Sequence, residues 1–129
     1  MKENLPDRTK AFALRVIKLS GALPNNRLGN VLGHQVLKSG TSIGANWREA
    51  RRASSKRHFV STTEICIREA DETAYWLELL SESEVVKSSR VIAIRDECNQ
   101  LVAILTAIAK RAKQGLRKSP RKASSIQNS

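Results

Sequence analysis

The side chains with the clearest chemistry in this sequence form two clusters of lysine and arginine. The first cluster surrounds the junction between two predicted helices and consists of Arg48, Arg51, Arg52, Lys56 and Arg57. The second lies near the end of the chain, contains no acidic residue, and consists of Lys110, Arg111, Lys113, Arg117, Lys118, Arg121 and Lys122. Guanidinium and ammonium groups bind phosphate oxygens. Both clusters are therefore candidate nucleic-acid-binding residues.

Other interpretations of the charge stay open. Cations in the last turn of a helix also complement the helix dipole, and a high net charge keeps a protein in solution or attracts an acidic protein or an anionic membrane. Aromatic residues make up only 4% of the chain, which leaves few rings to stack on bases. Binding should therefore depend on phosphate contacts, and this favours structured or double-stranded nucleic acid over single strands.

Carboxylates inside a helical bundle raise the question of a di-iron site, which needs a Glu-x-x-His motif on two helices. No glutamate here has a histidine three residues later, and His34 and His58 are isolated. The sequence also lacks a glycine-rich phosphate loop, a G-x-S-x-G motif and a cysteine paired with a histidine. We therefore predict no catalytic residue, no metal, no cofactor and no enzymatic activity.

The two cysteines, Cys66 and Cys98, lie in apolar helical patterns without C-x-x-C spacing. They are predicted to be reduced core residues rather than disulfide or metal ligands. The N-terminal segment lacks an apolar region of the kind that secretory signals contain, and no run of 18 apolar residues is present. We expect a cytoplasmic protein with no membrane partner.

A line of polar residues follows the second predicted helix in steps of three and four: Gln35, Ser39, Ser42, Asn46 and Glu49. The third predicted helix offers Thr62, Glu69, Glu72 and Thr73 as partners. A partly buried hydrogen-bonded network between these helices is expected, and it would fix helix register or a subunit contact rather than serve catalysis. Its predicted members are Gln35, Ser42, Asn46, Glu49, Glu69 and Glu72.

Four glycines, Gly29, Gly33, Gly40 and Gly44, share one face of the second predicted helix. Each costs about 1 kcal/mol relative to alanine in a helix interior, so a compensating contact is needed. A neighbouring backbone packed close to this face would supply that contact. The alternative is that the helix breaks near Ser39 and Gly40.

The elements that position these groups are four amphipathic helices, predicted at about residues 6–23, 26–52, 55–80 and 89–115. Short polar links between them indicate an all-α, antiparallel up-down-up-down four-helix bundle. The bundle is expected to span residues 1–115, and residues 116–129 to form a disordered basic tail. In such a bundle the junction of the second and third helices lies at the same end as the finish of the fourth. The two basic clusters would then form one basic pole.

The net charge of +11 on 129 residues is unevenly distributed. Residues 84–129 carry ten basic and three acidic side chains, whereas residues 1–83 carry thirteen and nine. The C-terminal part of the chain therefore supplies most of the excess, which strengthens the prediction of a basic pole.

Three stretches resemble a known family: Ser42-Ile-Gly-Ala-Asn-Trp-Arg-Glu-Ala50, then Phe59, then Glu69-Ala-Asp-Glu-Thr-Ala-Tyr-Trp-Leu77. They are similar to the four-helix bundle proteins encoded in intervening sequences of 23S ribosomal RNA genes, and the similarity extends from about Phe12 to about Ile108. The resemblance implies a homopentameric ring of bundles. It also implies kinship with the accessory subunit of diversity-generating retroelement reverse transcriptases, a basic ring that binds RNA or DNA and the polymerase.

Within the resemblance, Ser42, Asn46, Glu49 and Glu72 match recurring polar residues of the family. The long basic C-terminal segment is not general in the family, which favours nucleic acid for this chain in particular. The sequence therefore predicts a non-enzymatic, nucleic-acid-binding bundle, an accessory factor for an RNA or a reverse transcriptase. The alternative is a structural protein–protein interaction module whose basic charge is incidental.

Overall fold

The computed structural model describes residues 4–117, which form four α-helices and one short 3₁₀ turn. The helices are α1 (Leu5–Gly21), α2 (Arg27–Arg51), α3 (Lys56–Glu82) and α4 (Ile92–Arg117), and η1 (Ser88–Arg90) precedes α4. The predicted all-α class is confirmed. Helix α4 ends two residues later than predicted, at Arg117, and the predicted tail from residue 118 onward lies outside the described residues.

Side-chain caps explain where three of the helices begin. Asn26 accepts a hydrogen bond from the Gly29 backbone N–H at 2.9 Å, and Ser55 accepts one from the His58 N–H at 3.0 Å. Asn4 does the same for Asp7 at the start of α1. Each cap satisfies one of the backbone donors that have no partner in the first turn of a helix. The helix starts are thus set by residues that can be read from the sequence.

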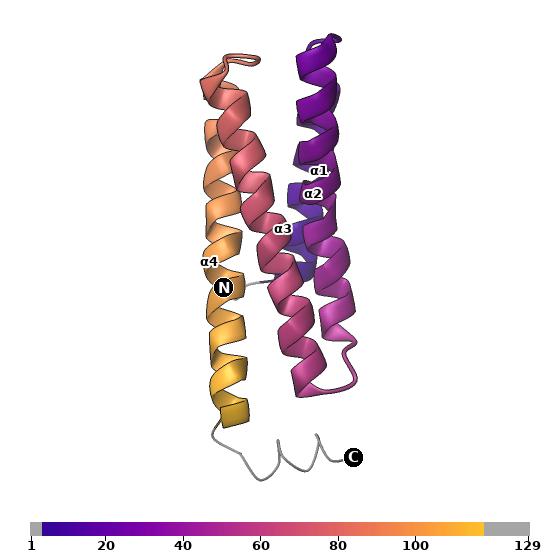
Figure 1. Ribbon diagram of the computed structural model, residues 1–129, viewed down its shortest axis with the longest axis vertical. Helices are drawn as coiled ribbons and strands as arrows, with labels where there is room; N and C mark the ends of the chain where they lie inside the picture. Colours follow the sequence, from indigo (N-terminus) through magenta and orange to yellow (C-terminus); the bar gives the residue numbers. More distant parts are fainter. Residues whose placement is uncertain (1–3, 118–129) are drawn as a thin grey trace.

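The helices run antiparallel along the long axis of the molecule (Figure 1). The α1–α2 and α3–α4 links lie at one end, and the α2–α3 link lies at the other, beside the end of α4. Sequential neighbours pack on each other, and α1 packs less extensively on α4, which closes the bundle. This arrangement confirms the predicted up-down-up-down bundle.

The core is built from the apolar stripes of all four helices. Its fully buried side chains include Phe12, Val16, Val36, Ile43, Cys66, Leu77, Leu80, Cys98, Leu101 and Leu105. The three-and-four spacing of these residues is what placed them together on the inner faces. Leu28 lies four residues before Leu32 on the same apolar stripe of α2, but it is 49% exposed.

The glycine face of α2 packs against α1, and α2 is continuous from Arg27 to Arg51. A Cβ on Gly40 would lie 2.9 Å from both γ-methyl groups of Val16, and one on Gly44 would lie 3.1 Å from Thr9 Oγ1. Close packing of a neighbouring helix is therefore confirmed, and the alternative of a broken helix is wrong. The absent side chains allow α1 to approach α2 closely.

One ion pair joins α1 to α4. The Arg8 guanidinium donates to both carboxylate oxygens of Glu97, at 2.7 Å and 2.9 Å, and also to Gln100 Oε1 at 2.7 Å. A two-pronged Arg–carboxylate contact fixes orientation as well as distance. Because the packing between α1 and α4 is the least extensive among neighbouring helices, this contact helps to close the bundle.

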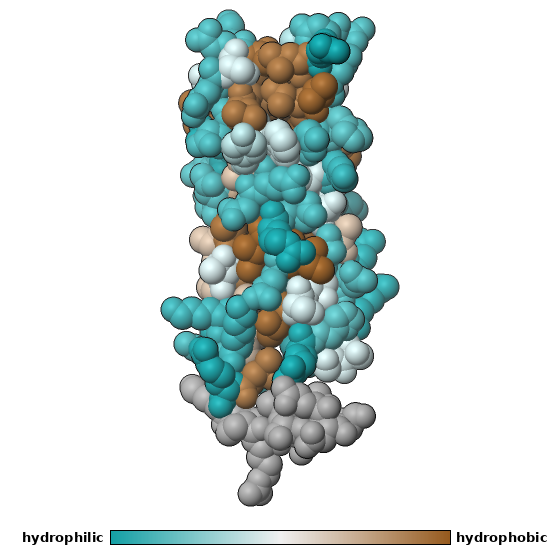
Figure 2. All heavy atoms as spheres, viewed as in Figure 1, coloured by the Kyte–Doolittle hydropathy of each residue, from teal (hydrophilic) through white to brown (hydrophobic). Residues whose placement is uncertain are grey.

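The surface is mainly hydrophilic, and the hydrophobic areas on the face in Figure 2 lie at the upper end, in the middle and in a strip that continues toward the lower end. The exposed large hydrophobic side chains are Leu14, Ile17, Leu28, Val31, Tyr75 and Ile92. None of the helices within residues 4–117 has a stretch long and apolar enough to cross a membrane.

Candidate nucleic-acid interface

Both basic clusters lie at the end of the bundle that carries the α2–α3 link (Figure 1). Arg48 and Arg51 occupy the last turn of α2, Arg52 is its C-cap, and Lys56 and Arg57 begin α3. The last part of α4 presents Lys110, Arg111, Lys113 and Arg117. All nine side chains are exposed, and we call them the basic pole. Lys118, Arg121 and Lys122 lie outside the described residues.

A shallow depression separates the two clusters, so they face a common surface. Its lining comes from the α2–α3 link and the start of α3 on one side and from α4 on the other: Ala53, Ser54, Ser55, Lys56, Phe59, Arg111, Ala112 and Gly115. Most of these residues are small, and the lining includes one cation from each cluster, Lys56 and Arg111. The geometry suits a polyanion that lies across the end of the bundle.

Acidic side chains neutralise little of the basic pole. Lys113 forms an ion pair with Glu64 of α3. No other member of the pole is ion-paired with a residue in the range 4–117. The remaining cations are thus available to bind phosphate oxygens.

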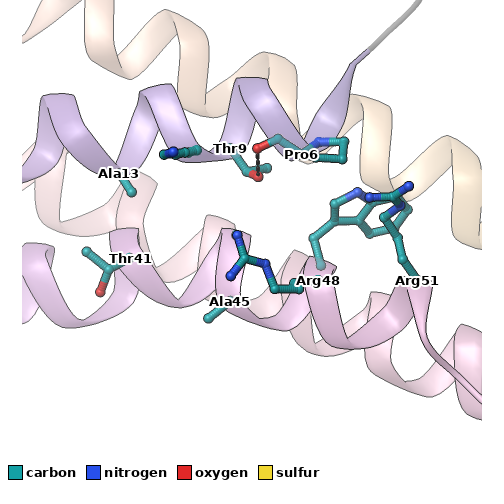
Figure 3. Close-up of a pocket in the computed structure, with 10 residues that line it drawn as sticks. Pro6, Thr9, Ala13, Thr41, Ala45, Arg48 and Arg51 are labelled. Atoms are coloured by element: carbon teal, nitrogen blue, oxygen red, sulfur yellow. Dashed lines mark hydrogen bonds between the residues drawn. The ribbon is translucent and has the colours of Figure 1, made fainter.

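A pocket of about 210 Å³ lies between α1 and α2 beside the basic pole (Figure 3). The Arg48 and Arg51 side chains extend from α2 into the space between the helices (Figure 3). The lining residues are Pro6, Thr9, Lys10, Ala13, Thr41, Gly44, Ala45, Trp47, Arg48 and Arg51. The sequence analysis did not identify Lys10 and Trp47 as site residues. The sequence contains only a weak indication of a pocket beside these two residues, namely the small residues on the side of α2 that faces α1.

Trp47 is the buried aromatic residue of this pocket. It is 7% exposed, and its ring meets that of Phe59 edge-on, with centroids 5.8 Å apart. Its indole nitrogen Nε1 is buried and has no hydrogen-bond partner, and no other buried side-chain polar atom of residues 4–117 shares this condition. An unpaired buried N–H costs about 1–3 kcal/mol.

The predicted polar network is arranged differently from the expectation. The buried contact that joins α2 to α3 is between two hydroxyls, with Thr73 Oγ1 2.9 Å from Ser39 Oγ. Ser42 and Asn46 donate instead to backbone carbonyls of their own helix, those of Lys38 and Ser42.

The other predicted network residues lie toward the surface. Glu49 and Glu72 are exposed, and Gln35 and Glu69 are half-buried. Desolvation, and then the charge of Glu72, raise the pKa of the Glu69 carboxyl, whereas Arg68 and Lys38 act in the opposite direction. A role for Gln35, Ser42, Asn46, Glu49, Glu69 and Glu72 between subunits stays a prediction.

Both cysteines are free and fully buried, as predicted. Burial raises the pKa of each thiol to about 12, and nearby carboxylates add to the effect. Cys98 Sγ also lies 3.2 Å from the Ala70 carbonyl oxygen, to which it donates. In the range 4–117 no group of three or more histidine, cysteine, aspartate or glutamate side chains is placed to hold a metal ion.

Fold and surface together define a small antiparallel helical bundle with one strongly basic end. The chain belongs to the 23S rRNA-intervening sequence protein family, whose family model matches residues 4–107. This confirms the resemblance to that family drawn from the sequence, and the kinship with the retroelement accessory subunit stays a prediction.

A crystal structure of a protein of unknown function from the S23 ribosomal protein family of Bacteroides thetaiotaomicron is similar to this chain. It is 38% identical, has a TM-score of 0.77, and the match covers 82% of this chain and 98% of that one. A search of curated proteins gave no match.

Proposed function

We propose that this protein is a non-enzymatic, nucleic-acid-binding bundle whose basic pole contacts the phosphates of structured RNA or of an RNA/DNA duplex. The observation that supports this most strongly is the gathering of exposed cations from three helices at one end, with one ion pair among them. Membership of a family named for 23S rRNA intervening sequences agrees with a role alongside RNA.

Contacts of this kind have a characteristic dependence on salt. Each phosphate that a lysine or arginine neutralises on duplex releases counterions, and the slope of log K against log salt changes by about −0.9 per phosphate. With few exposed aromatic rings, base stacking adds little. Binding should therefore be steeply salt-dependent and weakly sequence-dependent.

A matched pair of triple variants tests the interface. Arg52→Gln, Arg57→Gln and Arg111→Gln together remove three charges from the basic pole. Arg27→Gln, Lys87→Gln and Arg90→Gln remove three exposed charges from the opposite end. Gel-shift titration of structured RNA should show a slope lowered by about 2 to 3 for the first variant only. Equal losses in both variants would indicate an attraction to net charge, and no binding at low salt would refute the proposal.

We further propose that the protein assembles into a homo-oligomer, a pentamer as the family resemblance implies, and that a reverse transcriptase is a candidate partner. The exposed hydrophobic side chains Leu28, Val31 and Ile92 and the exposed carboxylate of Glu49 support an interface between copies. Sedimentation equilibrium measures the mass directly. Glu49→Ala or Asn46→Leu should change that mass or the melting temperature, whereas unchanged values in both variants would exclude these residues from the interface.

The same exposed hydrophobic residues favour a second candidate function, a protein-interaction module in which the charge is incidental. A protein partner captured by the full chain, and retained after nuclease treatment and with the triple variant of the basic pole, would support that alternative. Loss of capture on nuclease treatment would instead favour nucleic acid.

A further inference from the structure

The pocket between α1 and α2 combines three features that point to an anionic ligand. Lys10, Arg48 and Arg51 line it, and no acidic residue does. None of these three cations is ion-paired within residues 4–117. The pocket wall also includes Trp47, whose indole N–H is buried and has no acceptor. A ligand that brings oxygen acceptors and negative charge would satisfy all four groups.

We propose that this pocket binds a single phosphate group, with Trp47 Nε1–H as a neutral donor and Arg48, Arg51 and Lys10 as charged donors. The assignment deepens the proposed function, because Arg48 and Arg51 belong to the basic pole. Phosphate binding by the pocket does not depend on the proposed function. Only the identification of that phosphate as part of a nucleic acid rests on it. A nucleic-acid phosphate and free phosphate present the same chemistry to the pocket.

The remaining lining residues explain why the ligand must be an acceptor. The Thr9 hydroxyl already donates to the Leu5 carbonyl at 2.6 Å, and the Thr41 hydroxyl to the Leu37 carbonyl at 2.7 Å. Each hydroxyl has one proton, so neither supplies a further donor. Ala13, Gly44 and Ala45 contribute little or no side chain, and this leaves a volume of about 210 Å³. An apolar occupant of that space would leave the indole N–H unpaired.

Access to Trp47 requires a small movement. Less than 1 Å² of Nε1 is exposed, so the atoms that cover the nitrogen have to move before an oxygen can reach it. Arg48 and Arg51 extend into the space between the two helices (Figure 3). Both side chains are long and exposed, so they are free to move when a ligand enters. Binding should therefore change the surroundings of the indole ring, which gives a direct optical signal.

The test uses Trp76→Phe, which leaves Trp47 as the single tryptophan. Inorganic phosphate is titrated at constant ionic strength with chloride as the balancing ion, and Trp47 fluorescence is followed. We expect a saturable change with phosphate. No saturable change with either inorganic phosphate or duplex RNA would overturn the proposal.

Two matched pairs of variants in the Trp76→Phe background assign the site. Ala13→Leu should fill the pocket and abolish the signal, because the Ala13 methyl group points from α1 toward α2 (Figure 3). Ala103→Leu, at an exposed alanine of α4, should leave the signal unchanged. Arg48→Gln should weaken phosphate binding at least about fivefold, and Arg15→Gln, an exposed arginine outside the pocket, should not. A signal that survives Ala13→Leu would place the phosphate elsewhere and overturn the assignment.

A third measurement separates this proposal from the proposed function. By calorimetry, Trp47→Phe should weaken phosphate binding about three- to tenfold, the value of one neutral hydrogen bond, with the fold retained. Duplex RNA should give the same Trp47 signal, and Ala13→Leu should abolish it, if the phosphate belongs to nucleic acid. Saturation by inorganic phosphate without any RNA binding would refute the proposed function and retain the pocket, with free phosphate as its ligand.

Discussion

At the scale of single residues, burial decides what the reactive side chains can do. Cys66 and Cys98 are fully enclosed, and desolvation raises the pKa of each thiol to about 12, from an ordinary value near 9. Because burial disfavours the thiolate, thiol ionisation does not affect the stability of the fold below pH 9, and the stability falls as the pH rises from about 9 toward 12. The thiols are therefore core residues at physiological pH, and not nucleophiles.

We predict that both thiols react about a thousandfold more slowly than a free cysteine with an aromatic disulfide reagent at pH 8. A thiol with a pKa of about 12 instead of about 9 has a thiolate fraction about a thousandfold lower at pH 8. Burial slows the reaction further. The measurement is the absorbance of the released thiol, in native buffer and in urea. Rapid labelling of the native protein would show that a thiol is accessible, contrary to the structure.

The Arg8–Glu97 ion pair carries a second prediction at this scale. A double-mutant cycle with Arg8→Gln and Glu97→Gln should give a coupling energy of about 1 kcal/mol in urea unfolding, because the contact is two-pronged and largely shielded. The Arg95–Glu78 pair, at 3.7 Å and more exposed, is the control and should give about 0.5 kcal/mol or less. Equal couplings would show that geometry and burial contribute nothing here.

At the scale of helices, the sequence predicts the elements well because the relevant signals are local. Asn26 and Ser55 cap the helices that they precede, and the spacing of Cys66, Leu77 and Leu101 places them inside. The contacts between helices are less predictable. The glycine face predicted a close neighbour without identifying α1. The Arg8–Glu97 pair spans 89 residues of sequence, so no local pattern indicates it.

The candidate site shows the same division. The cations of the basic pole are visible as clusters in the sequence, and antiparallel topology alone is enough to bring them to one end. The pocket at Trp47 needs the actual separation of α1 and α2, which depends on Thr9, Ala13, Gly44 and Ala45 together. Side-chain volume at a helix contact is a tertiary property, so the sequence left Lys10 and Trp47 unassigned.

The close contact of α1 and α2 predicts opposite effects for two alanine substitutions. Gly40→Ala should lower the free energy of unfolding by about 1–2 kcal/mol, because its Cβ would lie 2.9 Å from both methyl groups of Val16, and this strain exceeds the gain in helix propensity. Gly115→Ala, with no atom within 4 Å of the new Cβ, should be neutral or stabilise α4 by up to about 1 kcal/mol. Chemical denaturation distinguishes the two, and a stabilising Gly40→Ala would contradict the packing.

At the scale of the whole molecule, the proposed function depends on charge and on assembly. The basic pole occupies one end, and the exposed large hydrophobic side chains, among them Leu28, Val31 and Ile92, are not part of it. The two surfaces can therefore act separately, one toward a polyanion and the other toward a protein. Copies assembled through the hydrophobic areas would bring several basic poles together and raise the affinity for a long polyanion without any new contact.

Removal of the chain after Arg117 tests the C-terminal cations without cutting α4, which reaches that residue. The truncation removes Lys118, Arg121 and Lys122. We expect an unchanged melting temperature, weaker RNA binding, and a salt slope lowered by up to about 2 to 3. An unchanged slope would show that these three residues do not contact phosphates, and a lower melting temperature would show that they contribute to the fold.

The unequal lengths of the helices have a consequence for local stability. Helix α1 has 17 residues and meets α4 near Glu97 and Gln100, so the last turns of α4 extend beyond α1. In these turns the residues that face α3 include Ala109, Ala112 and Gly115, which bury little apolar area. Amide hydrogens of residues 110–117 should therefore exchange with solvent faster than those of residues 98–105. A bound polyanion would slow that exchange, so part of the binding energy would be used to order the end of α4.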